Sequence, residues 1–93
     1  MEHINKIELA GIVGTLKETR LDEKNRNIRF TLAVNESAGN VVTTTWFSCT
    51  YWGEHIISKG QEIHIKGRMI SNRYADAEGN EKTFYEVRVS SIL

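Results

Sequence analysis

Apolar and polar residues alternate along most of the chain with a period of two. The segment 27–34, NIRFTLAV, is the clearest example, because its bulky apolar residues fall at every second position and basic or small residues lie between them. Side chains two residues apart on an extended chain point to the same side, so this segment predicts a β-strand with one buried face. The same alternation predicts further strands in the segments 4–16, 43–53, 61–74 and 83–93.

Polar and glycine-containing segments separate these strands. The segments 21–27 (LDEKNRN) and 35–40 (NESAGN) are predicted turns. The segment 75–81 (ADAEGNE) is a predicted hairpin loop, in which Gly79 and Asn80 supply the positive φ angles of a tight reversal. The segment 53–60, GEHIISKG, is too short for more than a turn or two of helix.

The number and order of these elements predict a closed barrel. Gly11 and Gly14 interrupt the alternation of the first strand and predict a bulge or a sharp bend there. Five strands, with a very short helix or turn between the third and the fourth, are the elements of a five-stranded Greek-key barrel. An open meander is the alternative, but it would leave two exposed edges in a small chain. We therefore expect an all-β barrel that occupies residues 1–93 as a single domain.

Composition limits where and with what the chain works. Cys49 is the only cysteine, so no intrachain disulfide is possible, which suits the reducing cytoplasm. The N-terminus does not resemble a signal peptide and no apolar run is long enough to cross a membrane, so we expect a cytoplasmic protein without a membrane partner. Twelve basic residues balance twelve acidic ones. A polyanion would therefore be attracted only if the charges are sorted by face.

The sequence contains no recognisable catalytic or metal-binding constellation. His3, His55 and His64 lack the spacing and the cysteine companions of a zinc site. Neither Ser48 nor Cys49 has a legible histidine and acid partner, and Cys49 falls on the predicted core face, where a thiol is inert. We therefore expect no enzymatic activity and no metal or other cofactor.

Two tryptophans lie on the face of the third strand that otherwise looks solvated. In the segment 43–53, TTTWFSCTYWG, Trp46 and Trp52 are both even-numbered residues. Residues of the same parity, that is, all even-numbered or all odd-numbered, lie on the same face of a strand, so the two tryptophans share a face with Ser48 and Thr50. The residues of opposite parity in this segment form the predicted core face. Exposed aromatic rings stack on the unpaired bases of single-stranded nucleic acid, so this arrangement predicts a base-binding surface. A dimer interface would bury the same rings, and the pattern alone leaves both interpretations open.

Other aromatic and basic residues share the predicted outer surface. In the last strand, Tyr85, Val87 and Val89 are predicted to point inward. The candidate nucleic-acid-binding residues other than the two tryptophans are Arg29, Lys66, Arg68, Arg73, Tyr74, Phe84 and Arg88. Lys and Arg bind phosphates and release counterions, which complements base stacking and requires no particular base sequence.

Five segments resemble, in order, the bacterial single-stranded DNA-binding protein family: NKIELAGIVGTL, FTLAVNES, TTTWFSCTYWGE, KGQEIHIKGRM and RYADAEGNEKTFYEVRV. The resemblance extends from Asn5 to Leu93 and is most specific around the two tryptophans. It implies an OB-fold barrel, that is, an oligonucleotide-binding barrel, over which single-stranded DNA wraps. It also implies that Trp46 and Trp52 match base-stacking positions of the family. Tyr74 matches a third such position, as a tyrosine where tryptophan is frequent.

The chain departs from the family pattern in four places. Ala38 stands where the family often has a further stacking tryptophan, and the loop from Ser37 to Thr43 is short and lacks Lys and Arg. The insert Gly53 to Gly60 is abbreviated, and the sequence stops at Leu93 without the acidic C-terminal tip of the family. We therefore expect weaker binding or a shorter footprint, and no recruitment of partners through a tail.

Two functions follow as hypotheses. The first is sequence-independent binding of single-stranded DNA in replication, recombination or repair, by a homodimer or homotetramer that has replication proteins as further partners. The second is a dimeric barrel similar to primosomal replication protein N, which acts mainly through protein partners. The retained Trp46, Trp52 and Tyr74 favour the first, and the bare loop favours the second. The first strand, from Ile4 to Leu16, is a candidate edge for pairing between chains.

Overall fold

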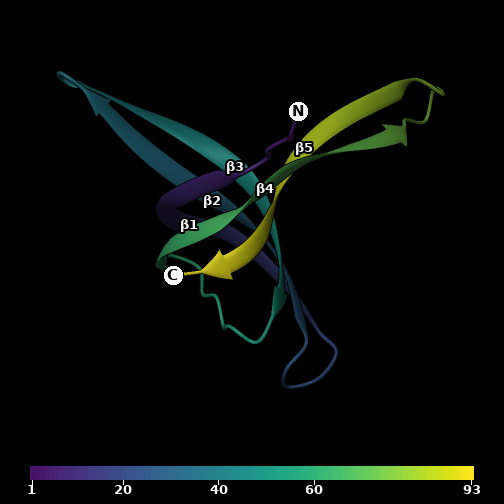
Figure 1. Ribbon diagram of the computed structural model, residues 1–93, viewed down its shortest axis with the longest axis horizontal. Coiled ribbons are helices and arrows are strands. Elements are labelled where there is room, and N and C mark those ends of the chain that lie inside the picture. The colour runs from purple at the N-terminus through teal and green to yellow at the C-terminus, as the bar shows by residue number, and fades with distance from the viewer.

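The computed structural model describes residues 1–93 and contains five β-strands and no helix. The strands are β1 (Ile7–Arg20), β2 (Arg26–Ala38), β3 (Val41–Gly53), β4 (Glu62–Ala75) and β5 (Glu81–Ile92). They form a closed barrel in the order β1-β2-β3-β5-β4 (Figure 1). The predicted all-β five-stranded barrel is therefore confirmed. With strands alone, the fold has no helix that could span a lipid bilayer.

β1 bends sharply because it pairs with two neighbours in turn. Its first part is antiparallel to β4 and its second part is antiparallel to β2, and the two registers meet at Ile12. The pairing with β2 shifts between Val13 and Leu16. Gly11 lies just before this shift, and a Cβ at that position would collide with the carbonyl oxygen of Ala33. The bend predicted from the glycines of the first strand is confirmed.

A short connection without helix joins β3 to β4 and is attached to the bend of β1. The amide of Gly60 donates to the carbonyl of Val13 (2.8 Å), and the amide of Val13 donates to the carbonyl of Gln61 (2.9 Å). Ile57 reaches from this connection into the core and is buried. Burial of such a side chain stabilises the fold by about 1.5–3 kcal/mol, so this connection contributes to the core without forming a helix.

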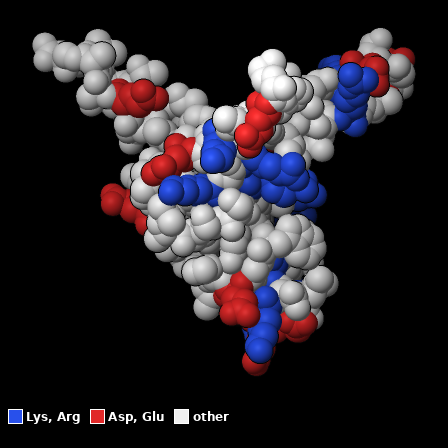
Figure 2. Space-filling view, viewed as in Figure 1, with Lys and Arg blue, Asp and Glu red and all other residues white.

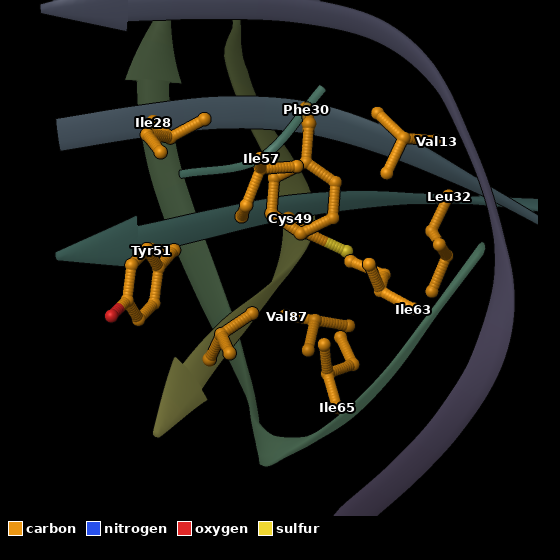
Figure 3. Packing of buried hydrophobic residues seen from close by; sticks show 11 residues of the cluster. Val13, Ile28, Phe30, Leu32, Cys49, Tyr51, Ile57, Ile63, Ile65 and Val87 are labelled. Atoms are coloured by element: carbon orange, nitrogen blue, oxygen red, sulfur yellow. The ribbon is translucent and has the colours of Figure 1, made fainter. Parts of the chain in front are cut away.

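The interior of the barrel is filled by apolar side chains from all five strands (Figure 3). The largest fully buried side chains are Val13, Ile28, Leu32, Ile65 and Val87. Ile28, Leu32, Ile65 and Val87 lie on the faces that the alternation of their strands predicts to be inward, whereas Val13 lies where the alternation of the first strand is interrupted. The parallel pairing of β3 with β5, from Cys49↔Val87 to Tyr51↔Val89, closes the barrel around this core. Within the barrel, every second residue of each strand points into the core, so the residues between them point to the outer surface.

Two hairpins continue beyond the barrel as arms (Figure 1). We define the β2–β3 arm as residues 35–45 and the β4–β5 arm as residues 71–85. Every residue of the β2–β3 arm is exposed, and only Asn72 and Asp76 of the β4–β5 arm are partly buried. In Figure 1 the β2–β3 arm extends to the upper left and the β4–β5 arm to the upper right. Both are therefore two-stranded ribbons with no core of their own.

The turn predicted at residues 35–40 is present but much shorter than predicted, because the strands continue through most of this segment. Asn35 pairs with Thr44, and the ladder runs on to the pair Ala38↔Val41. Only two residues form the turn, and the first, Gly39, has a φ of 63°, the conformation that glycine adopts most easily. The polar composition of 35–40 resembles a turn, but an arm with solvent on both faces does not need apolar residues to remain a strand.

Two predictions for the β4–β5 hairpin are wrong. Gly79 has a φ of 82° but Asn80 does not have a positive φ. The loop is held instead by Asp76, whose carboxylate accepts hydrogen bonds from the amides of Glu78 (3.0 Å) and Asn80 (2.9 Å). Tyr85 was predicted to point into the core, but it is 64% exposed. Its position on the strand has inward parity, yet it lies in the arm, beyond the end of the barrel.

Candidate nucleic-acid interface

The outer face of β3 presents two indole rings to solvent. Trp46 is 61% exposed and Trp52 is 55% exposed, whereas Cys49 and Tyr51 between them are buried. The orientation predicted from the parity of the third strand is therefore confirmed. Six residues of extended chain separate the two rings by roughly 20 Å. Between them, Ser48 is exposed but Thr50 is only 8% exposed, so the prediction that Thr50 lies on a solvated face is wrong.

Trp46 is held in place by a glycine of β1. A Cβ added to Gly14 would lie 2.5 Å from Cζ3 of Trp46 and 2.9 Å from Oγ1 of Thr31. Because Gly14 has no side chain, the six-membered ring of the indole has room to lie next to β1 at this position. Because the ring is supported by the barrel and still mostly exposed, it is a preformed surface for stacking. Gly14 thus serves the predicted site as well as the bend of β1.

Three of the predicted basic residues belong to one row across the barrel. Arg29 on β2 pairs with Thr50 on β3, Thr50 pairs with Arg88 on β5, and Arg88 pairs with Arg68 on β4. Lys17 on β1 extends the row, because it pairs with Arg29. The row crosses β3 between the two tryptophans, so basic side chains lie beside the path from one indole to the other.

Lys66 lies apart from this row. It pairs with Glu8 on β1 and with Ser91 on β5, and the register of β4 with β5 shifts between Lys66 and Gly67. Lys66 therefore lines a different hollow, next to an acidic side chain. Figure 2 shows Lys and Arg side chains in a band across the middle of the molecule, with acidic side chains immediately above it.

The β4–β5 arm brings together the remaining predicted aromatic residues. The rings of Tyr74 and Phe84 pack edge to face with their centroids 5.7 Å apart, and both residues are about half exposed. Arg73 alternates with Tyr74 and so points to the opposite face of the ribbon, where it forms an exposed ion pair with Glu81, with Nη1 and Oε1 3.8 Å apart. Exposed pairs of this kind contribute little to stability and are readily exchanged for another anion.

A polar network connects β3, β4 and β5 at the base of this arm. The carboxylate of Glu86 accepts hydrogen bonds from the hydroxyl of Thr50 and from the amide of Asn72 (2.7 Å), and it lies 3.7 Å from Arg88. Burial alone would raise the pKa of Glu86. The two hydrogen bonds, together with the charges of Arg88 and Arg29, outweigh burial and hold that pKa below its ordinary value. Glu86 is therefore ionised at neutral pH and holds the hydroxyl of Thr50 by a hydrogen bond. The parity count had placed Thr50 on the solvated face.

A groove of about 380 Å³ lies at the centre of these residues. Arg29, Thr50, Phe84 and Glu86 line it, together with residues of β1. The groove therefore joins the row of cations on the barrel to the aromatic pair on the arm. Cavities of this size accept small aromatic molecules or single bases.

Two residues that the sequence analysis missed belong to this surface. Tyr85 borders the same hollow as Trp46, a space of about 200 Å³. Lys17 lines the central groove and continues the basic row. The parity count could not place Lys17, because the register shift between Val13 and Leu16 breaks the alternation just before it. Residue pairs counted outward from the hairpin loop at 76–80 would have placed Tyr85 opposite Ser71. Ser71 follows the apolar part of β4, so this pairing would have placed Tyr85 outside the core.

Cys49 is among the residues that line the central groove, but its thiol is buried. Burial, and after it the negative charge of Glu86, raises the pKa of Cys49 to about 12, so the thiol stays protonated at neutral pH. No group of three or more His, Cys, Asp or Glu side chains is arranged to hold a metal ion. The chemistry of the outer face is therefore that of stacking rings, hydroxyls and charged side chains.

Comparison with known proteins assigns the chain to a family. Residues 4–93 match the model of the single-strand binding protein family. The chain belongs to this family. A curated member, single-stranded DNA-binding protein 1 of Chlorobaculum tepidum, is 28% identical over 93 aligned residues, which cover 87% of this chain and 57% of that protein. The chain thus spans little more than half the length of that relative.

The fold of the family agrees with the barrel described above. A solved structure, described as Plasmodium falciparum SSB complex with ssDNA, has a TM-score of 0.80 to this chain at 19% identity. The match covers 100% of this chain and 96% of the other. The predicted OB-fold is therefore confirmed, as is the predicted family. A family of strand-binding proteins also agrees with the expectation that the chain is not an enzyme.

Proposed function

We propose that this protein binds single-stranded DNA without requiring a particular base sequence, in replication, recombination or repair. The observation that carries the proposal is the pair of exposed indoles on the outer face of β3, one of them supported by Gly14. Exposed indoles are costly to leave in water, but each offers a stacking surface that every base can use. The proposal agrees with membership of the single-strand binding protein family.

In this mechanism, bases stack on the rings and phosphates are bound by the cations between them. Trp46 and Trp52 on the barrel and the Tyr74–Phe84 pair on the β4–β5 arm supply the rings. The proposed phosphate-binding residues are Arg29, Lys66, Arg68, Arg73 and Arg88. Each phosphate contact releases counterions, so affinity falls as salt is added. Net charge is zero, so attraction depends on this local grouping rather than on the whole molecule.

We further propose that the working form is a homodimer or a homotetramer and that replication proteins are its partners. Residues 7–11 of β1 pair with β4 only, so one edge of this segment has no neighbouring strand within the chain. A second copy could add a strand there, and the candidate edge proposed from the sequence is thereby narrowed to the first part of β1. Sedimentation equilibrium, with and without a long single strand, tests this.

Titration with oligo-dT tests the binding proposal directly. Stacking on Trp46 and Trp52 should quench tryptophan fluorescence, and the affinity should fall steeply with added salt. Double-stranded DNA of the same length is the control and should quench much less, because its bases are already paired and stacked. Absence of quenching and of complex formation at micromolar protein would contradict the proposal.

The second candidate, a barrel that acts mainly through protein partners, is favoured by the β2–β3 arm. This arm has one charged residue, Glu36, and exposed Val41 and Val42 near its tip. Such a ribbon offers neither cations nor rings to DNA. If oligo-dT does not bind while the oligomer persists, the protein-interaction function becomes the better explanation.

A further inference from the structure

A small polar hollow on β1 and β2 lies beside Trp52. It measures about 150 Å³ and is lined only by Lys17, Thr19, Asn27 and Arg29. These residues form two cross-strand pairs, Lys17↔Arg29 and Thr19↔Asn27. The hollow therefore has two cations on one side and two polar side chains on the other, with no apolar group.

The pairing of Lys17 with Arg29 is unfavourable within the chain itself. Like charges directly opposite each other on neighbouring strands destabilise a sheet. Neither residue forms an ion pair, since the five ion pairs of the chain involve other cations. The side chain of Asn27 also lines the hollow, and its Nδ2 is a donor from which an anion can accept a hydrogen bond. Lys17 has no acidic partner and Arg29 acts on Glu86 only from beyond ion-pair distance, so an anion in the hollow would stabilise both cations.

The position of the hollow indicates which anion. Asn27 is the register partner of Trp52, and Arg29 is the register partner of Thr50, the next outward residue of β3. Neighbouring strands are about 4.8 Å apart, so the hollow lies directly beside the exposed indole. A single strand whose base stacks on Trp52 has its phosphodiester backbone next to that ring. A guanidinium offers paired donors to a phosphate, and a lysine ammonium adds a compact charge.

We propose that Lys17 and Arg29, together with Thr19 and Asn27, form a phosphate-binding subsite for the nucleotide that stacks on Trp52. This subsite rests on the proposed function, because it binds the backbone of the same single strand. It adds Lys17 to the phosphate-binding residues and assigns Arg29 to a particular nucleotide. It also gives the two like charges a common ligand that offsets their repulsion.

The variant Lys17→Gln tests the subsite through the salt dependence of oligo-dT binding. Loss of one phosphate contact on a single strand should reduce the slope of log affinity against log salt by about 0.7, which is about a fivefold loss of affinity at about 0.1 M salt. Lys59→Gln is the matched control, because Lys59 is an exposed lysine in the β3–β4 connection, away from the hollow. It should leave the slope unchanged.

Three outcomes separate the possibilities. If the parent protein binds no oligo-dT, the proposed function fails. If the parent binds and Lys17→Gln has the same slope and affinity as Lys59→Gln, the subsite alone is wrong. The thermal midpoint of Lys17→Gln without DNA should be no lower than that of the parent, because the change removes an unfavourable pairing. A clearly lower midpoint would show that Lys17 stabilises the fold, and would overturn the subsite.

A second comparison tests the link to Trp52. The losses of affinity caused by Lys17→Gln and Trp52→Ala should not be additive, because both groups bind the same nucleotide. The losses caused by Lys17→Gln and Trp46→Ala should be additive, because that ring is roughly 20 Å away along β3. Additivity in both double variants would overturn the assignment of the hollow to the nucleotide on Trp52.

Discussion

The two arms have the same backbone architecture but carry different kinds of side chain. Each is a two-stranded antiparallel ribbon that leaves the barrel and is exposed on nearly every residue. The β4–β5 arm has three aromatic residues, two cations and three acids: Tyr74, Phe84, Tyr85, Arg73, Lys82, Asp76, Glu78 and Glu81. The β2–β3 arm carries no aromatic residue and no cation (Figure 2).

This difference is tolerated because neither ribbon has a core to fill. A ribbon is held by its ladder of backbone hydrogen bonds and by cross-strand pairs, such as Asn35 and Thr44, whose side chains are 2.5 Å apart. Its outward side chains are therefore free to differ without cost to the barrel. If the proposed function is correct, DNA is bound by the barrel and one arm, and the other arm contributes little.

The largest expected effect comes from removal of the rings of the β4–β5 arm. The double variant Tyr74→Ala/Phe84→Ala should weaken oligo-dT binding by about 2–6 kcal/mol, at about 1–3 kcal/mol per stacked base. The matched change on the other arm is Val41→Thr/Val42→Thr, which should leave the affinity unchanged. Fluorescence anisotropy of labelled oligo-dT measures both. Equal losses of oligo-dT affinity in the two double variants would show that the arms do not differ in DNA binding.

A smaller effect is expected at the root of the β2–β3 arm, where Trp46 lies. Trp46→Ala should cost about 1–3 kcal/mol of DNA affinity. Gly14→Ala should reproduce much of this loss, because the new Cβ would lie 2.5 Å from the indole and displace it.

Trp46→Ala should remain folded, since Trp46 is 61% exposed. Urea unfolding checks this against Phe30→Ala, a core deletion that should cost about 3–5 kcal/mol of stability. A comparable loss of stability in Trp46→Ala would mean that the indole is part of the packing and not a free stacking surface.

Charge changes should have effects of about 1 kcal/mol per phosphate contact at about 0.1 M salt. Arg68→Glu should weaken binding and flatten the salt dependence, because Arg68 belongs to the basic row. Lys66→Glu should do so less, because Lys66 lies beside Glu8 and away from the row. On the arms, Arg73→Gln should lower the salt slope and Glu36→Gln should not. Salt titrations of oligo-dT affinity rank the four variants, and the reverse order would contradict the proposed path of the strand.

The smallest effect concerns the polar network at the base of the β4–β5 arm. The pKa of Glu86 in the folded protein lies below its ordinary value of 4.5. The carboxylate therefore adds stability that is fully present above that value and is lost as the pH falls through the folded pKa. Glu86→Gln should be less stable at neutral pH by roughly 1 kcal/mol, and it should lose less stability between neutral pH and pH 3. Urea unfolding at several pH values measures this, and parallel pH profiles would contradict it.

The local pattern of residues was sufficient to place the core and the stacking rings. Trp46 and Trp52 face solvent, and Ile28, Phe30 and Leu32 face the core, because successive side chains on any strand alternate between two sides. This property depends only on the covalent backbone, so a parity count within one uninterrupted strand is reliable. It also gave the number of strands, and with the glycines of the first strand it gave the closed barrel.

Only the tertiary structure decided where the barrel ends and which outward residues become neighbours. Tyr85 has inward parity but lies beyond the core, and residues 35–38 continue as strand although their composition is that of a turn. Lys17 lies opposite Arg29 because of a register shift in β1, and a second shift follows Lys66, which lies apart from the basic row. Registers are set by pairing between segments distant in the sequence, and a change of one residue exchanges the faces of a strand. The rings of the proposed site were therefore predictable, whereas the arrangement of its charges depended on the fold.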